Sequence, residues 1–250
     1  MKANSRRRVL ISSLSMLLVA LVALSTATYA WFTSNTQATG QGINVKTVKS
    51  SKLVISNIAK TWDTQIDYDV DDKALLPVSS ANGTNWFKAE GTSETDGSAK
   101  TGTYSGVTVL DSYVIKDQLN VKNEGETAIN NVTITVAGLE DYVRVALVET
   151  SNRGAGLANT GTFSTSIIDS EGDEYIPLSA ASAPATDADP ITCNTCLNDE
   201  GKFEVGNLAP NAAKYYNLYV WFEGQDADCY DNNQQIVDNI VFTVNGTPAA

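Results

Sequence analysis

Apolar residues alternate with polar ones over short stretches of this chain, and turn-forming residues separate the stretches. In residues 129–136 (INNVTITV), the apolar side chains at positions 132, 134 and 136 fall on every second residue. This period matches a β-strand with one buried and one solvated face. The same reading predicts twelve strands, at residues 43–48, 53–58, 65–70, 106–110, 115–122, 129–136, 142–149, 163–168, 175–178, 202–205, 215–222 and 236–244.

The spacing of these segments predicts the fold class. No segment after residue 30 has a helical apolar period over three turns, and only residues 226–239 leave room for a short helix. Many short strands separated by turn residues predict an all-β fold, a jelly-roll-like β-sandwich. Residues 89–103 and 179–192 are poor in apolar residues and are predicted as long loop insertions. We therefore expect residues 43–250 to form a single domain.

Residues 1–30 have the pattern of a secretory signal. Four basic residues within the first eight positions precede an apolar run at residues 9–24. Cleavage is predicted after Ala30, with cleavage after Ala27 as the alternative, because small residues precede both positions. An uncleaved membrane anchor is the competing interpretation, since the apolar run approaches the ~20 residues that span a bilayer. The chain is therefore expected to be secreted.

The charge of the mature chain excludes two classes of partner. Without residues 1–30 the chain keeps 13 of its 17 basic residues and all 29 acidic ones, a formal charge of −16. This charge opposes electrostatic binding to nucleic acid or to an anionic membrane surface. We expect the chain to contact a membrane only through the signal segment, before cleavage.

Three cysteines, Cys193, Cys196 and Cys229, allow one disulfide and one unpaired thiol in an extracellular protein. A bond from Cys229 to Cys193 or Cys196 is the preferred pairing, and a bond within the C-N-T-C motif is the alternative. Zinc binding is not favoured, because the chain has no second C-x-x-C motif and no histidine. The loop-like flanks of the motif also lack a helix N-terminus that would acidify a thiol, so a redox role is not favoured.

The complete absence of histidine restricts the possible chemistry. It removes the commonest general base, the commonest metal ligand and both the Ser-His-Asp and Cys-His arrangements. Carboxylate pairs occur, but they are expected by chance in a chain this acidic. We therefore predict no catalytic residues and no enzymatic activity.

One acidic stretch, EGQDADCYDNN at residues 223–233, concentrates the carboxylates of Glu223, Asp226, Asp228 and Asp231. Oxygen ligands of this kind suit calcium, but the spacing lacks the Gly and the distal Glu of an EF-hand loop. A solvated acidic turn is the preferred interpretation and a calcium site is the alternative. No other metal or cofactor is expected.

Three short stretches are distinctive when taken together. The first is the export boundary TYAWF at 28–32, followed by the Gly-led segment GINV at 42–45. The second is LNVKNEGETAI at 119–129, and the third is LAPN at 208–211, leading to YVWFEGQD at 219–226. Together they resemble the TasA/camelysin family of secreted bacterial matrix proteins. The first is similar to the family's threonine, aromatic, alanine and phenylalanine around the cleavage site, the second to its strand, Asn-x-Gly turn and next strand, and the third to the W-x-E-G-x-D segment of cysteine-bearing relatives.

The resemblance implies a jelly-roll domain, export through a dedicated signal peptidase and, for matrix-forming members, head-to-tail polymerisation by donor-strand complementation. Residues 31–42 would then be an extended N-terminal arm, the candidate donor strand, with Trp31 and Phe32 as its anchors. Expected partners are further copies of the chain and other proteins of a bacterial biofilm matrix. An arm that folds back on its own sheet is the alternative.

Two other functions compete with a fibre subunit. A monomeric cell-surface β-sandwich that binds a glycan or a host protein through its long loops is the main alternative. Some family members are described as metallopeptidases, but the absence of histidine speaks against carrying that activity to this chain. A protease therefore ranks last.

Overall fold

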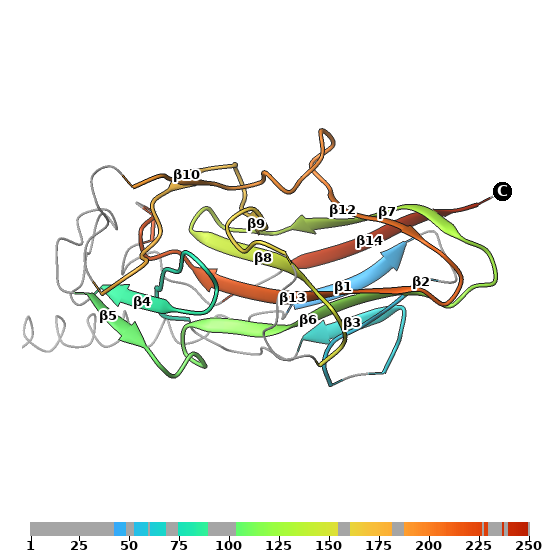
Figure 1. Cartoon of the computed structure of the whole chain (residues 1–250), viewed down its shortest axis with the longest axis horizontal. Coiled ribbons are helices and arrows are strands. Elements are labelled where there is room, and N and C mark those ends of the chain that lie inside the picture. The colour runs from blue at the N-terminus through green and yellow to red at the C-terminus, as the bar shows by residue number, and fades with distance from the viewer. Residues whose placement is uncertain are drawn as a thin grey trace, which may run out of the picture. The chain divides into compact units, whose positions relative to one another are not determined.

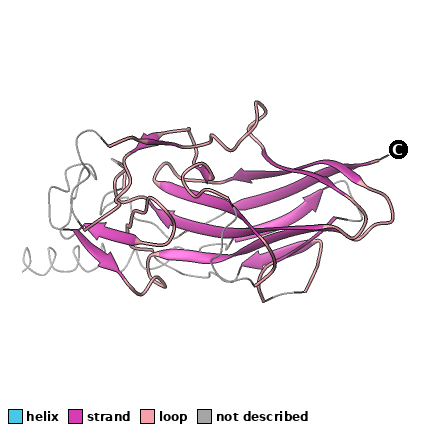
Figure 2. Cartoon of the chain, viewed as in Figure 1, coloured by secondary structure: helices cyan, strands magenta, loops and turns pink. Residues whose placement is uncertain are grey.

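The computed structural model describes residues 43–48, 53–59, 61–68, 75–89, 104–154, 161–181, 188–226, 228–229, 237 and 240–249. All of them belong to one compact unit, Gly40–Ala250. Figure 2 shows strands and loops throughout this part of the chain and no helix, so the all-β prediction is confirmed. It follows that nothing in these ranges forms a membrane-spanning helix. The predicted signal segment and the N-terminal arm lie outside the described residues.

Two five-stranded sheets make up most of the described structure (Figure 1). The first sheet has the order β12 (Phe203–Leu208), β7 (Ile129–Ala137), β14 (Val241–Pro248), β1 (Ile43–Val48) and β3 (Gln65–Tyr68). The second has the order β2 (Leu53–Ser56), β6 (Val114–Asn123), β13 (Ala213–Phe222), β8 (Val143–Thr150) and β9 (Ile167–Ile168). Two short hairpin-like pairs accompany them: β4 (Trp86–Ala89) with β5 (Tyr104–Val107), and β10 (Glu174–Tyr175) with β11 (Ile191–Thr192).

The main hydrophobic core lies between the two five-stranded sheets. In β7, the buried positions 129, 132 and 134 are separated by more exposed ones, as the alternating sequence predicts. Residues from the facing strands of the second sheet complete the core, so the arrangement is the sandwich expected from the sequence. Fully buried members from the two sheets include Ile134, Phe242, Val244, Leu119, Val121, Leu218 and Val220.

The second sheet is also covered on its outer face. Trp86, Phe163 and Tyr175 pack over Tyr219 and other outward residues of β8 and β13 in a second hydrophobic cluster. The ring centroids of Trp86 and Phe163 are 6.0 Å apart in an edge-on arrangement. Because these strands are buried on both faces, their sequences (VRVALVET and AKYYNLYVWF) do not alternate cleanly.

The N-terminal strand β1 lies in the interior of the first sheet. It pairs in parallel with β14, from Asn44 beside Val241 to Val48 beside Asn245. On its other side it pairs antiparallel with β3, which is the last described strand of that sheet. The first described strand of the chain thus occupies an internal position in its sheet.

Strand boundaries differ from the predictions where the pattern is short or interrupted. Residues 163–168, predicted as one strand, form a turn and the two-residue strand β9. β4 was not predicted, and β11 lies in a segment predicted as loop. β4 and β11 each pair over only a few residues. Their side chains pack on the outer face of the second sheet, and this packing stabilises both strands. The predicted insertion at 89–103 lies mostly outside the described residues.

Candidate functional site

A buried arginine is the centre of the most concentrated group of charges in the described structure. Arg144 is the second residue of β8, where Val143 and Val145 face the main core. The alternation of a strand directs Arg144 to the opposite, covered face, and its side chain is 0% exposed. An unpaired cation in this position would be strongly destabilising, so its partners decide whether the fold tolerates it.

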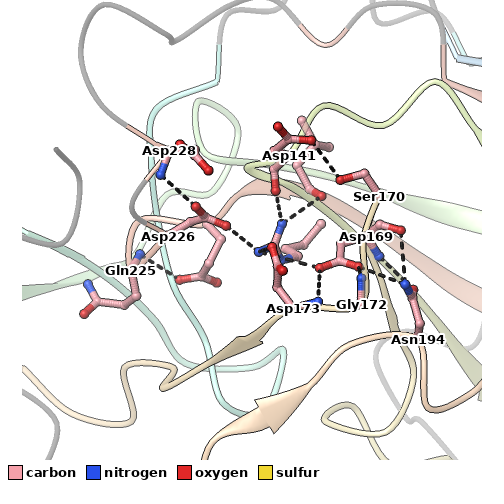
Figure 3. Close-up of polar contacts among 12 residues, drawn as sticks. Asp141, Asp169, Ser170, Gly172, Asp173, Asn194, Gln225, Asp226 and Asp228 are labelled. Atoms are coloured by element: carbon pink, nitrogen blue, oxygen red, sulfur yellow. Dashed lines mark hydrogen bonds and ion pairs between the residues drawn. The ribbon is translucent and has the colours of Figure 1, made fainter. Parts of the chain in front are cut away.

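Three carboxylates from two loops surround the guanidinium (Figure 3). Asp226 accepts a hydrogen bond from Nη2 of Arg144. The Oδ2 atoms of Asp169 and Asp173 each lie 3.7 Å from the same nitrogen. The Nη1 atom donates to the backbone carbonyls of Asp141 and Val143. We refer to Arg144, Asp169, Asp173, Glu223 and Asp226 as the arginine cluster.

Asp169 also organises the turn that follows β9. Its Oδ1 accepts hydrogen bonds from the backbone N of Gly172 at 2.6 Å and from Nδ2 of Asn194 at 2.9 Å. Its Oδ2 accepts from the backbone N of Asp173 at 3.0 Å. The Oδ1 atom of Asn194 in turn accepts from the backbone N of Asp169 at 3.0 Å. These bonds join the turn after β9 to the loop that contains the cysteine motif.

Glu223 and Asp226 form the corresponding turn after β13. Glu223 is fully buried, and its two oxygens accept from Nε1 of Trp221 at 2.9 Å and from the backbone N of Gln225 at 3.0 Å. Asp226 accepts from the backbone N of Asp228 at 2.8 Å through the oxygen that does not face Arg144. Gly224 fits closely here, because its backbone N donates to the carbonyl of Val78 at 3.1 Å.

Burial and charge shift the pKa values of this cluster in opposite directions. Burial raises the pKa of Glu223 to about 7, although Trp221, Ser79 and Arg144 all favour its charged form. Burial also raises the pKa of Asp226, against the lowering effects of the Asp228 backbone and Arg144. For Arg144, burial lowers the pKa, but the negative charge of Asp226 and its neighbours outweighs burial and the net shift is upward. Arg144 is therefore a permanent cation.

Two buried polar atoms beside the cluster have no hydrogen-bond partner among the described residues. These are Nε of Arg144 and the hydroxyl of Tyr175. The guanidinium carbon of Arg144 lies 5.5 Å from the centroid of the Tyr175 ring, a distance suited to a cation–π contact. The cluster therefore ties the loop cover to β8 by charge, hydrogen bonds and an aromatic contact.

The three cysteines lie close to this region, and none forms a disulfide. The structure therefore does not support the predicted pairing of Cys229 with Cys193 or Cys196, and that pairing stays a prediction. Burial raises the pKa of the Cys193 thiol well above its usual value and that of Cys196 to about 11. Both are protonated at neutral pH, which agrees with the expectation that this C-N-T-C motif does not acidify a thiol.

The carboxylates of the calcium candidates are engaged with groups of the protein. Glu223 faces Trp221, Asp226 faces Arg144, and Asp231 lies outside the described residues. Within the described ranges, no three His, Cys, Asp or Glu side chains gather in a way that would hold a metal ion. A cation here would also have to approach the positive charge of Arg144. The preferred interpretation from the sequence was a solvated acidic turn. That prediction is wrong for Glu223, which is 0% exposed.

The sequence around Arg144 contains one signal for the cluster. Arg144 interrupts the apolar run V-R-V-A-L-V, and charged residues are almost never fully buried without a partner. That signal indicates a buried ion pair but not its partners, because Asp169 and Asp226 lie far away in sequence. Ala30, Trp31 and Phe32, the residues predicted for cleavage and donor anchoring, lie outside the described residues.

Comparison of the chain with family models, with curated proteins and with solved structures finds no match.

Proposed function

We propose that this chain is a secreted structural subunit of an extracellular fibre in a bacterial biofilm matrix. In this proposal, residues 31–42 of one subunit complete a sheet of the next, and subunits assemble head to tail by donor-strand complementation. The chain performs no catalysis, needs no cofactor and has its own copies as main partners. The resemblance of the export boundary and of two internal stretches to matrix-forming proteins motivates the proposal.

The observation that best supports the proposal is the position of β1. The arm of residues 31–42 leads directly into Ile43, and β1 lies between β14 and β3 rather than at an edge. β1 is bonded on one side to β14, at the far end of the sequence, so the place beside β14 can be filled by a strand of the same chain or of another copy. The N-terminal region is therefore the part of this fold best suited to exchange between subunits.

The edge of the first sheet offers a place for an incoming strand. Within the described residues, β3 pairs along one side only, with β1. Its Ile66 and Tyr68 side chains are each 2% exposed, so the strand is held firmly against the core while one backbone edge stays unpaired. The opposite edge strand, β12, is interrupted by two register shifts and is a poorer template.

The physical consequences of such pairing fit a fibre. An extended peptide that adds to a sheet edge gains main-chain hydrogen bonds, and its side chains supply specificity. Contacts between different surfaces of identical subunits generate filaments when the rotation from one subunit to the next does not close a ring. Burial of Trp31 and Phe32 in the acceptor would each contribute about 1.5–3 kcal/mol.

Electron microscopy of the purified mature protein tests the proposal. We expect filaments from residues 31–250 and only folded monomers after deletion of residues 31–42. The double variant Trp31→Ala/Phe32→Ala should polymerise weakly, because it keeps the backbone of the arm but loses its anchors. Thr36→Ala/Gln37→Ala is the matched control within the arm and should polymerise normally.

The same experiment separates the fibre from its main alternative. A monomeric binding module would form no filaments at any concentration and would be unaffected by deletion of the arm. Filaments that form equally well without residues 31–42 would show that donor-strand complementation by this arm is wrong.

A further inference from the structure

The outer face of the first sheet contains a hollow where β12, β7 and β14 lie side by side. Its cavity volume is about 610 Å³, within the range of about 300–1,000 Å³ typical of ligand sites. Most of its lining is polar. We call it the polar cleft and define it by Asn131, Thr133, Lys202, Glu204, Asn245 and Thr247.

A slip in register on both sides of β7 creates this hollow. Along β12 the pairing shifts on either side of Gly206, which has φ of +89°. Along β14 it shifts between Asn245 and Thr247, at the same level of the sheet. Asn131, between these two points, pairs with neither neighbour and adopts φ of +51°. Bulges of this kind redirect side chains and occur often beside functional sites.

The backbone at Asn131 is held in its unusual conformation by the neighbouring strand. Its backbone N donates to Oδ1 of Asn207 at 2.9 Å. A positive φ costs energy for a residue other than glycine, although asparagine tolerates it better than most. The conformation and its hydrogen bond together fix one side of the cleft.

Gly246 brings the β14 backbone close to the core beneath the cleft. A Cβ atom at this position would lie 2.6 Å from Cγ2 of Ile129 and 3.1 Å from Cδ1 of Leu53. Only glycine lets the strand approach these side chains without displacing them. The hollow in the outer surface is therefore part of the packing and not a gap between mobile side chains.

Several polar groups in the cleft are available to a ligand. Among the described residues, the side chains of Asn131, Thr133, Asn245 and Thr247 make no hydrogen bond within the protein. Amides and hydroxyls can each donate and accept, as the hydroxyls of a sugar do.

Lys202 and Glu204 add charge at the rim of the cleft, but both already have partners in the protein. The Nζ atom of Lys202 lies 2.5 Å from Oε2 of Glu200, and Oε1 of Glu204 accepts from Nδ2 of Asn198 at 3.1 Å. A ligand would therefore use the remaining donor and acceptor capacity of these two side chains.

From these observations we infer that the polar cleft is a binding site for a neutral saccharide. A sugar presents many closely spaced hydroxyls, which match the amides and hydroxyls that line the cleft. An acidic polymer is disfavoured, because the chain has a formal charge of −12 and the cleft contains Glu200 and Glu204 against the single cation Lys202. The lining holds no aromatic residue, so hydrogen bonds rather than ring stacking would supply the affinity, and a single site should bind weakly.

The inference does not depend on fibre assembly, and its test uses the mature protein under conditions where it is monomeric. Neutral trisaccharides of glucose and of N-acetylglucosamine are added to isotope-labelled protein, and amide chemical shifts are followed by NMR. We expect concentration-dependent shifts centred on residues 131–133, 202–206 and 245–247 with at least one of the two probes. A negatively charged uronic-acid trisaccharide should produce shifts at least ten-fold weaker.

Matched variants show whether the cleft itself binds. Thr133→Val removes one hydroxyl from the cleft. Binding should weaken about ten-fold, which is the size of effect expected when one or two hydrogen bonds to the ligand are lost. Thr135→Val is the control, because it makes the same change on the same face of β7, two residues away and outside the lining. Glu204→Gln, at an exposed position, provides a second cleft variant that does not threaten folding.

Three outcomes would overturn the inference. The first is no shift at the cleft with either neutral trisaccharide at tens of millimolar. The second is binding that Thr133→Val and Glu204→Gln leave unchanged, which would place the sugar elsewhere. The third is tighter binding of the uronic-acid probe, or of a peptide, which would assign the cleft to another class of ligand.

Discussion

The two outer faces of the sandwich carry polar groups in opposite ways. On the second sheet, the members of the arginine cluster other than Asp173 are buried beneath a cover of loops, and Arg144 is paired there with Asp169 and Asp226. On the first sheet, the side-chain amides of Asn131 and Asn245 and the hydroxyls of Thr133 and Thr247 line the cleft and make no hydrogen bond with the described residues. In the arginine cluster, the polar groups bond to one another and to the backbone and so stabilise the fold. In the polar cleft, these side chains remain available to a ligand. We therefore assign binding to the cleft and a structural role to the arginine cluster.

The difference begins in the strands themselves. β8 is buried at almost every position, whereas buried and half-buried residues alternate along β7. A strand covered on both faces must find internal partners for any charge that it carries, because water cannot reach it. A strand with a free face can keep polar side chains that serve only a ligand. Four substitutions test this contrast, from the largest expected effect to the smallest.

Substitution of Arg144 should have the largest effect. Arg144→Met keeps an unbranched side chain but leaves Asp226 and Asp169 buried without their cation, so the free energy of unfolding should fall by about 3–5 kcal/mol. Chemical denaturation of the variant measures this loss. The double variant Arg144→Met/Asp226→Leu should be more stable than the single one. A loss below about 1 kcal/mol would mean that water already solvates the cluster.

Substitution of Glu223 should change how stability depends on pH. Because burial raises the pKa of Glu223 from 4.5 to about 7, the folded chain keeps this proton in a range where the unfolded chain loses it. The free energy of unfolding should therefore fall as the pH rises from about 4.5 to about 7, by at most about 3 kcal/mol from this group. Glu223→Gln, which cannot ionise, should remove that fall.

Urea denaturation between pH 4.5 and pH 8 measures this slope in both proteins. Glu140→Gln, at an exposed side chain, is the matched control for loss of one negative charge. If the slopes of the wild type and of Glu223→Gln were equal, the carboxyl of Glu223 would titrate as an ordinary solvated group.

Addition of one methyl group at Gly246 tests the packing beneath the cleft. Gly246→Ala places a Cβ against Ile129, Leu53 and Val132 and should destabilise the fold by about 1–3 kcal/mol through overpacking. Gly106→Ala is the control, because nothing lies within 4 Å of an added Cβ there. Thermal unfolding of the two variants compares them directly. Equal melting temperatures would contradict a tightly packed cleft floor.

An exposed ion pair on the second sheet should matter least. The Nζ atom of Lys214 lies 2.7 Å from Oε1 of Glu149, and their side chains are 38% and 46% exposed. Lys214→Met should cost less than about 1 kcal/mol, because exposed pairs gain little over solvation by water. Chemical denaturation of Lys214→Met and Arg144→Met under the same conditions compares the two losses of unfolding free energy. The difference shows how much more a buried ion pair matters to stability than an exposed one on this sheet.

Sequence patterns predicted the β-sandwich fold, but they did not predict the arginine cluster or the polar cleft. Alternation in residues 129–136 identified β7, and the predicted bounds 43–48 match β1. The parallel pairing of β1 with β14 was not predictable, because partners almost two hundred residues apart leave no local pattern. The partners of Arg144 were missed for the same reason, although its place in an apolar run was visible. The cleft depends on the relative register of three strands, a property that no single stretch of sequence contains.

The position of β1 connects this fold to the proposed fibre. In the proposed fibre, exchange between subunits would depend on this strand, which lies inside its sheet and directly follows residues 31–42 in the sequence. The polar cleft lies on the same sheet, so a fibre would display it repeatedly and could hold a polysaccharide more strongly than one subunit does.

A competition measurement tests the donor arm most directly. A synthetic peptide of residues 31–42 is added in excess to the mature monomer at the start of assembly, and filaments are counted by electron microscopy. We predict that the peptide occupies the acceptor edge and arrests assembly, whereas a peptide with Ala at positions 31 and 32 has no effect. Filaments of normal number and length at a saturating concentration of the natural peptide would contradict donor-strand complementation.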